Sequence, residues 1–138
     1  MTQENISALV NFRIEQAESS VRAATLLENE GAMREVIHLS YYAMFYAVLA
    51  LLAVEQRESS KHQGVISLFD RDYVRKGFFP KDFSKWLHGA FNLRQEADYA
   101  PLRCPSKEEA HEVLDNAIRF LRGVKERLEK QLTNSSAQ

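Results

Sequence analysis

The sequence has few of the residues that build turns, disulfides or metal sites. Its 5 glycines and 3 prolines leave little material for an all-β fold, in which strands alternate with turns. Its single cysteine, Cys104, excludes a disulfide framework and a thiolate metal cluster. The chain also lacks HExxH, P-loop and G-x-G-x-x-G motifs, so the sequence predicts no metal and no cofactor.

A net charge of one sign is missing as well. With 18 basic and 19 acidic residues the formal net charge is −1, which excludes a general attraction to nucleic acid. The charge is unevenly spread, because residues 1–30 carry −3 and residues 57–103 carry +3. We therefore expect any polyanion to bind the middle of the chain.

Only one apolar run is long, over residues 36–54. A membrane-spanning helix needs about 20 such residues, but this run contains His38, Ser40 and three tyrosines. A helix that is apolar all round is also what the centre of a bundle requires, so we interpret the run as a core helix and expect no membrane association. The first residues lack the pattern of a signal peptide, which together with the single cysteine favours the cytoplasm.

Apolar residues recur at steps of three and four in several segments, which predicts helices. The expected helices are 5–29, about 32–55, a third through Tyr73, a fourth that begins at Pro80 or Asp82, and a last one from Ser106 past Leu128. This pattern predicts an all-α fold, an antiparallel up-and-down bundle of four long helices plus one shorter helix. We expect a single domain over residues 1–132 and a disordered polar tail at 133–138.

Three local motifs mark the expected helix ends. Gly31 suits a left-handed C-terminal cap after the first helix. Ser60 with Gln63, and Ser106 with Glu109, have the spacing of capping boxes for the third and last helices.

The stretch FNLRQEADYA continues an apolar helical stripe with charges. Phe91 is followed on the same face by Arg94 and Asp98, with Tyr99 beside them. An exposed pair at this spacing contributes only about 0.2–0.5 kcal/mol, whereas a buried pair more often marks specificity or a site. The structural and the functional interpretation both stay open here. We expect Arg94, Asp98 and Tyr99 to line a polar cleft at a dimer interface.

The histidines fall into three groups. Lys61 and His62 open the third predicted helix, where the helix N-terminus and the lysine favour anions. We predict that these two residues bind phosphate or nucleotide, and a solvated capping turn is the alternative. His38 is predicted to be a hydrogen-bonded core histidine, and His88 and His111 are predicted at the surface.

The aromatic run Tyr41, Tyr42, Phe45 and Tyr46 covers several faces of one helix. A base-stacking platform needs exposed rings, so we predict core and dimer packing for these residues instead. The helix has more apolar faces than one small bundle can cover, and large exposed apolar patches are unusual in monomers. A homodimer is the expected assembly.

Four motifs in the order HLSYYAMFYAVLALL, KHQGVISLF, YVRKG and AFNLRQEADY resemble the small stand-alone HEPN-domain proteins of prokaryotes. The resemblance covers about residues 5–130. It implies an antiparallel bundle of four or five helices and often a homodimer. Many members are metal-independent ribonucleases, and many are encoded beside a minimal nucleotidyltransferase with which they form a toxin–antitoxin pair.

The signature of these ribonucleases is an arginine, four to six residues of any kind and then a histidine, both facing a cleft between protomers. Arg94 matches the arginine, but the positions for the histidine hold Tyr99, Ala100 and Pro101. The catalytic residues that the resemblance offers instead are Arg94, Asp98 and Tyr99. Arg57 and His62 have the signature spacing, and we interpret this match as a coincidence because they lie between two predicted helices.

Catalysis without the signature histidine needs another base. Asp98 is a weak base, and the charge of Arg94 beside it would weaken it further. His62 from another helix is the candidate to replace the histidine. The resemblance thus implies an RNA- or nucleotide-binding protein of a toxin–antitoxin-like or defence system, with metal-independent ribonuclease activity as one outcome. The alternative is a non-catalytic dimeric interaction module that partners a minimal nucleotidyltransferase.

Overall fold

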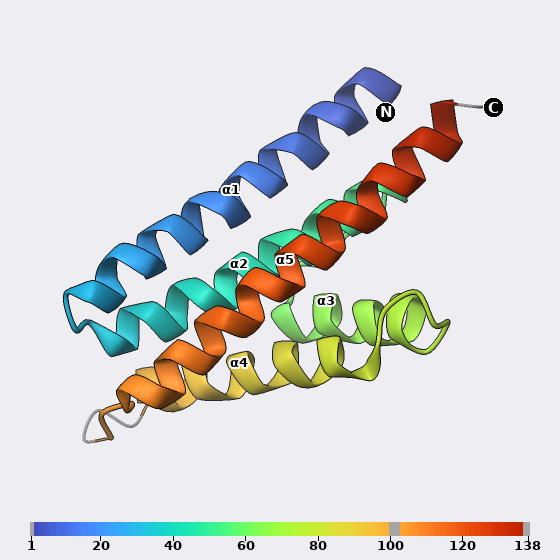
Figure 1. Ribbon diagram of the computed structural model, residues 1–138. Coiled ribbons are helices and arrows are strands. Elements are labelled where there is room, and N and C mark those ends of the chain that lie inside the picture. Colours follow the sequence, from blue (N-terminus) through green and yellow to red (C-terminus); the bar gives the residue numbers. More distant parts are fainter. Residues whose placement is uncertain (1, 100–102, 137–138) are drawn as a thin grey trace.

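The computed structural model describes residues 2–99 and 103–136, which form a bundle of helices (Figure 1). The helices are α1 (Gln3–Asn29), α2 (Met33–Val54), α3 (His62–Phe69), α4 (Lys81–Tyr99) and α5 (Lys107–Ser136), and a π-helical turn, η1 (Asp70–Val74), follows α3 directly. No strand occurs within the described ranges. The predicted all-α fold of four long helices and one shorter helix is confirmed.

The long helices run alternately up and down the bundle (Figure 1). α1 and α2 form an antiparallel pair, and α5 packs along α2 and runs in the same direction as α2. α2 is the central element, since it packs against α1, α3, α4 and α5. Residues of α2, α3 and α4 can therefore meet on one side of α2.

The long apolar run is buried in the bundle because α2 has neighbours on most sides. Val36, Ile37, Met44 and Leu51 are each 0% exposed. Burial of one such side chain stabilises the fold by about 1.5–3 kcal/mol. Length and composition alone would let α2 cross a membrane, but 67% of its most apolar stretch is covered by the rest of the bundle.

Two of the three predicted helix-end motifs are confirmed. Gly31 has φ +78° directly after α1. Ser106 and Glu109 cap each other, because the Glu109 N–H donates to the Ser106 Oγ at 3.0 Å and the Ser106 N–H donates to the Glu109 carboxylate at 3.1 Å. The predicted box at Ser60 is wrong. α3 begins one residue later than that box requires, and Lys61 is its N-cap without a side-chain cap.

The third predicted helix is continuous to Tyr73, but its second half is not α-helical. The Arg75 N–H donates to the Asp70 carbonyl at 2.9 Å, the i to i+5 bond of a π-helix. The expected tail at 133–138 lies mostly in α5, which continues to Ser136, and residues 137–138 lie outside the described residues.

Candidate functional site

Three helices meet at the phenol of Tyr41. Tyr41 lies on α2 and is 0% exposed. Its hydroxyl lies 2.7 Å from Nδ1 of His62, in the first turn of α3. The guanidinium carbon of Arg94, on α4, lies 5.6 Å from the centre of the Tyr41 ring. The fold thus brings together Arg94 and His62, which the sequence places on different helices. We call Tyr41, Tyr42, Phe45, His62 and Arg94 the Arg94–His62 site.

Arg94 is held by aromatic rings more than by carboxylates. Its guanidinium carbon also lies 5.3 Å from the centre of the Tyr42 ring, and cation–π attraction of this kind is worth about 0.5–2 kcal/mol. Its side chain is 22% exposed, and its Nε is buried without a hydrogen bond. Asp98, with an oxygen 3.5 Å from Nε, is the one carboxylate within ion-pair distance in the described part of the chain. The terminal nitrogens of Arg94 are therefore open to an anion.

His62 has a stacked and neutral imidazole ring. Its ring stacks on Phe45 with the ring centres 4.3 Å apart and the planes 13° apart. Burial and then the positive charge of Arg94 hold the pKa of His62 below its ordinary value, so the imidazole is neutral at pH 7. Burial raises the pKa of the Tyr41 phenol, which stays protonated. Since Nδ1 faces Tyr41, Nε2 is the ring nitrogen left for a substrate.

α4 supplies Arg94 in the way that its stripe predicts. Phe91 packs on Tyr41 with ring centres 5.6 Å apart, and Arg94 follows three residues later on the same side. Asp98 is at the edge, where its side chain is 39% exposed. Tyr99 does not join the group, because one further residue turns it by about 100° and leaves it 82% exposed. The prediction that Tyr99 lines a cleft at a dimer interface with Arg94 and Asp98 stays a prediction, because the structure describes a single chain.

The remaining predictions on the second and third helices have mixed outcomes. Lys61 is exposed beside His62, and the structure does not test its predicted role in binding phosphate. Arg57 pairs with Asp72 and not with His62, so the Arg-x4-His match is not one site. His38 is half-buried against the Tyr42 ring, with centres 4.9 Å apart, because it lies on the outer side of α2 and not in the core.

The other two histidines lie at the surface, as predicted. The side chain of His88 is 49% exposed and pairs with Asp70. That of His111 is 71% exposed and pairs with Glu28. Within residues 2–99 and 103–136, no group of three or more histidine, cysteine or acidic side chains is placed to hold a metal ion.

The aromatic run is divided between core and site. Tyr41 is fully buried, whereas Tyr42, Phe45 and Tyr46 are half-buried on the outer side of α2. Sequence reasoning missed Tyr41 as the partner of His62. The spacing of residues within one helix says nothing about a side chain that arrives from another helix.

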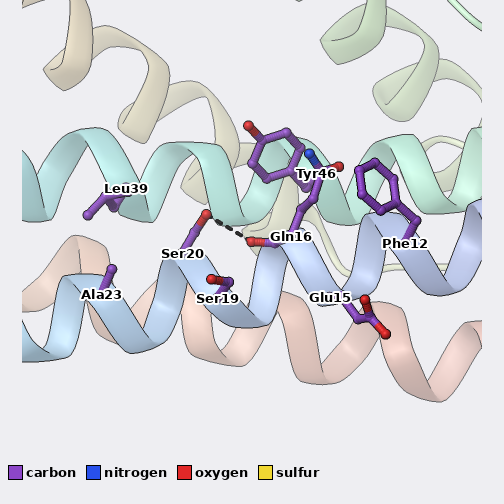
Figure 2. Close-up of a pocket in the computed structure, with 8 residues that line it drawn as sticks. All are labelled: Phe12, Glu15, Gln16, Ser19, Ser20, Ala23, Leu39 and Tyr46. Carbon is purple, nitrogen blue, oxygen red and sulfur yellow. Dashed lines mark hydrogen bonds between the residues drawn. The ribbon is translucent and has the colours of Figure 1, made fainter.

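A groove lies beside this row, between α1 and α2 (Figure 2). It has a volume of about 390 Å³, and Tyr46 and Leu39 line it on the α2 side. On the other side, α1 contributes Phe12, which is 51% exposed, and several polar side chains. Among these, the hydroxyl of Ser20 donates a hydrogen bond to the backbone carbonyl of Gln16 at 2.9 Å. The groove is thus partly apolar and continues the aromatic row.

The chain belongs to the HEPN domain family, whose model matches residues 10–128. It is 32% identical over 130 residues to "Putative toxin MJ0605" of Methanocaldococcus jannaschii, an alignment that covers 94% of this chain and 93% of the relative. It is 33% identical over 115 residues to "Putative toxin MJ0142" of the same organism, an alignment that covers 83% of this chain and 78% of that relative. A UPF0332 protein of Thermotoga maritima is 33% identical over 107 residues, 78% of this chain and 80% of that protein.

Proposed function

We propose that this HEPN protein is a toxin-like protein that binds RNA and cleaves it without a metal ion. The convergence of Arg94 and His62 on Tyr41 carries this proposal. Metal-free cleavage needs a base for the 2′-hydroxyl proton and a cation for the negative charge on the pentacoordinate phosphorus. The printed names of the two Methanocaldococcus relatives support the toxin-like role.

In the proposed reaction, Nε2 of neutral His62 takes the proton from a ribose 2′-hydroxyl. The 2′-oxygen then attacks the adjacent phosphorus, and the bond from phosphorus to the 5′-oxygen of the next nucleotide breaks. The leaving 5′-oxygen takes a proton from water, and the protonated His62 gives its proton to the hydroxide that remains. The products are a 2′,3′-cyclic phosphate and a 5′-hydroxyl end. Arg94 donates hydrogen bonds to the non-bridging phosphate oxygens, on which the negative charge grows.

Two neighbours have supporting roles in this proposal. The contact between the Tyr41 hydroxyl and Nδ1 of His62 fits either direction of hydrogen bonding, and the proposed reaction uses the tautomer in which Nδ1–H donates to Tyr41 and the lone pair stays on Nε2. Lys61, exposed one residue before His62, binds a phosphate next to the cleaved bond. Asp98 lies too far from Arg94 for a strong hydrogen bond and gives way to the phosphate.

The test is incubation of the purified protein with RNA in EDTA, followed by analysis of the product ends. We expect 2′,3′-cyclic phosphate ends from the parent protein. Arg94→Ala should reduce the rate by about 100-fold or more, and His62→Gln should reduce it by a similar factor. Arg122→Ala and His111→Gln are matched controls on α5, and both should cleave like the parent.

Two results would contradict the ribonuclease proposal. One is the absence of cleavage with the parent protein over a range of RNA substrates. The other is cleavage that both site variants retain at the parent rate, which would place the chemistry elsewhere or in a contaminant.

The second candidate function is a non-catalytic, cytoplasmic interaction module, with a second copy of this chain and a minimal nucleotidyltransferase as its partners. The half-buried aromatic row of α2, the groove beside it and the exposed ring of Phe12 favour this candidate (Figure 2). A dimer at this face would cover apolar surface that the single chain leaves open. Light scattering that finds a monomer at micromolar concentration would count directly against it.

A further inference from the structure

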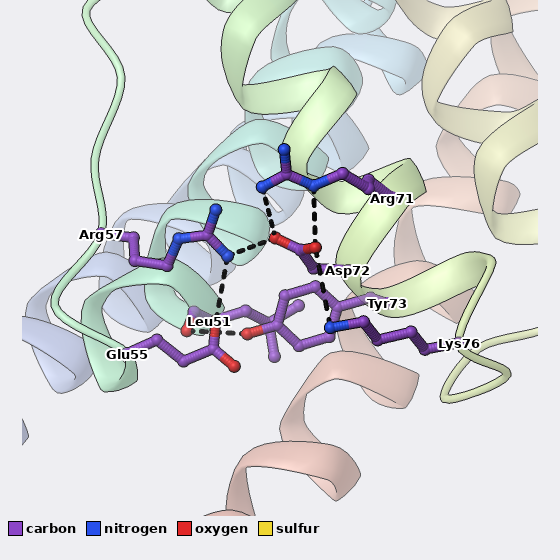
Figure 3. A network of polar contacts seen from close by, with 7 residues as sticks. All are labelled: Leu51, Glu55, Arg57, Arg71, Asp72, Tyr73 and Lys76. Atoms are coloured by element: carbon purple, nitrogen blue, oxygen red, sulfur yellow. Dashed lines mark hydrogen bonds and ion pairs between the residues drawn. The ribbon is translucent and has the colours of Figure 1, made fainter.

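A second arginine-containing cluster lies at the far end of α2, around the carboxylate of Asp72 (Figure 3). Asp72 is only 8% exposed, and it accepts two hydrogen bonds from Arg71, at 2.9 and 3.1 Å. It also accepts a short hydrogen bond from Arg57, and the Lys76 ammonium lies 3.9 Å away. We call Glu55, Arg57, Arg71, Asp72 and Lys76 the Asp72 cluster.

Local backbone geometry builds this cluster. The C-terminus of α2 closes with the Arg57 N–H on the Leu52 carbonyl at 2.9 Å and with Gln56 at φ +54°. This left-handed turn directs Arg57 back toward η1. In η1 the π-helical turn buries Asp72 and its neighbour Tyr73, whose hydroxyl donates to the Leu51 carbonyl at 3.1 Å. Asp72 therefore faces the end of α2, and the basic side chains around it face outward.

The basic groups keep hydrogen-bond donors that Asp72 does not use. In Figure 3 one terminal nitrogen of Arg57 and one of Arg71 point away from the carboxylate. The side chain of Arg71 is 56% exposed, that of Lys76 is 63% exposed, and Arg75 beside them is exposed. Three cations and two carboxylates give the cluster a net charge of +1, and Arg75 adds another positive charge.

We propose that the Asp72 cluster, together with Arg75, is a binding site for the phosphate backbone of single-stranded RNA. The inference rests on the proposed function for its choice of polyanion. Asp72 fixes the orientation of two guanidinium groups before the ligand arrives, and a planar guanidinium fits phosphate oxygens with paired N–H donors. Because the groups are already ordered, binding loses less side-chain entropy than it would with free arginines.

The chain connects this site to the Arg94–His62 site. Arg57 is five residues before His62, and the exposed Lys61 lies between them. An RNA strand that leaves His62 along Lys61 would therefore reach Arg57 within a few nucleotides. Phosphate contacts of this kind position a strand and carry no sequence information. We expect the Asp72 cluster to hold RNA of any sequence while the Arg94–His62 site acts on it.

The test measures binding without cleavage. A fluorescent 2′-O-methyl oligouridylate lacks the 2′-hydroxyl that cleavage needs, so its binding can be followed whether or not the protein is a ribonuclease. Affinity is measured over a range of salt concentrations for the parent and for Arg71→Gln, Arg75→Gln and Lys76→Gln. Arg122→Gln on α5 is the matched control. Arg75 and Lys76 are exposed, so their variants should fold even if Arg71→Gln loses stability.

Each lost phosphate contact should reduce the slope of log affinity against log salt by about 0.7. We expect this smaller slope in all three cluster variants and an unchanged slope in Arg122→Gln. The reduction should be the same for oligonucleotides of other base sequences. Unchanged slopes in Arg75→Gln and Lys76→Gln, or no binding of the oligonucleotide by the parent, would overturn the proposal. Tighter binding of polyglutamate than of RNA would also overturn it, because the surface would then fit an acidic protein.

Asp72→Asn tests the positioning role separately. This change adds one positive charge, so a diffuse attraction predicts tighter RNA binding. Loss of the fixed guanidinium groups predicts weaker binding, measured at a temperature where the variant is folded. Tighter binding would overturn the positioning role. Absence of RNA cleavage by the parent protein together with intact RNA binding would contradict the ribonuclease proposal alone. Salt slopes that stay unchanged in the cluster variants would contradict the Asp72 cluster alone.

Discussion

Arg94 lies over the rings of Tyr41 and Tyr42, whereas Arg57 and Arg71 are held by the carboxylate of Asp72. An aromatic face attracts a guanidinium without using its N–H donors, so those donors stay open to a ligand. A carboxylate uses some of the donors and fixes the rest in direction. In the proposed function, the open donors of Arg94 can bind phosphate oxygens as negative charge grows on them during cleavage. The fixed donors of Arg57 and Arg71 suit a phosphate that is only bound and whose charge does not change.

The two sites also differ in what they do for the fold. Asp98, beside Arg94, is 39% exposed and lies on the same helix, so their ion pair does not connect separate segments of the chain. Asp72 is 8% exposed and joins η1 to the end of α2 through Arg57. A buried carboxylate with several cationic partners is costly to leave incomplete, whereas an exposed pair contributes little. Stability should therefore depend on the Asp72 cluster and hardly on Asp98.

The largest expected effect follows from this difference. Asp72→Asn should lower the melting temperature by about 5 °C or more. Arg57 and Arg71 lose their shared ionic partner, and the segment of α3 and η1 loses the ion pair that connects it to the end of α2. Asp98→Asn should change stability by no more than about 0.5 kcal/mol. Thermal melts of both variants provide the measurement. Equal losses of stability in the two variants would show that the fold does not depend more on Asp72 than on Asp98.

The next effect concerns stability in acid. Hydrogen bonds from Arg71 and then Arg57 hold the pKa of Asp72 well below its usual range. The carboxylate therefore contributes stability that is fully present above its unfolded pKa of about 4 and is lost as pH falls through the lower folded pKa. Urea unfolding between pH 2 and pH 7 should show this decline in the parent. In Asp72→Asn the decline should be smaller, and an identical decline would exclude Asp72 as its source.

A smaller effect is expected at the Arg94–His62 site. Tyr41→Phe removes the hydroxyl that lies 2.7 Å from His62 Nδ1 and keeps the buried ring. Loss of this hydrogen bond should cost about 1 kcal/mol in urea unfolding. If the ribonuclease proposal holds, the rate of RNA cleavage should fall by a larger factor than the loss of stability alone would cause, because His62 loses the hydroxyl that holds its ring in place. Phe69→Leu, a change in the same core away from the site, is the control for a general loss of packing.

The smallest effect is a shift in one pKa. Burial is the larger cause of the low pKa of His62, and Arg94 is the smaller one. Arg94→Ala should therefore raise the pKa of His62 without restoring its ordinary value of about 6.5. The imidazole resonances of His62 in an NMR pH titration give the measurement. An unchanged pKa in the variant would mean that the two side chains lie farther apart in solution.

Local sequence determined where most of the helices begin and end, apart from the start of α3 and the end of α5, and with them the fold class. Apolar steps of three and four specify the inward side of each helix, and Gly31 and the Ser106–Glu109 box act within a few residues of themselves. The stripe on which Arg94 follows Phe91 is local in the same way, so the sequence identified Arg94 as unusual. The HEPN family was likewise recognisable from motifs in order, and the family match confirms it.

Only the tertiary structure decided which side chains meet. Tyr41, His62 and Arg94 come from three helices, and their contact depends on how α3 and α4 pack against α2. The outward turn of Tyr99 follows from where α4 docks. Phe69 and Tyr73 keep α-helical spacing across the start of the π-helical turn, so the apolar pattern of the sequence does not reveal the turn that buries Asp72. Contacts between distant segments are set by the packing of whole helices, and that packing sums many small contributions that no single motif reveals.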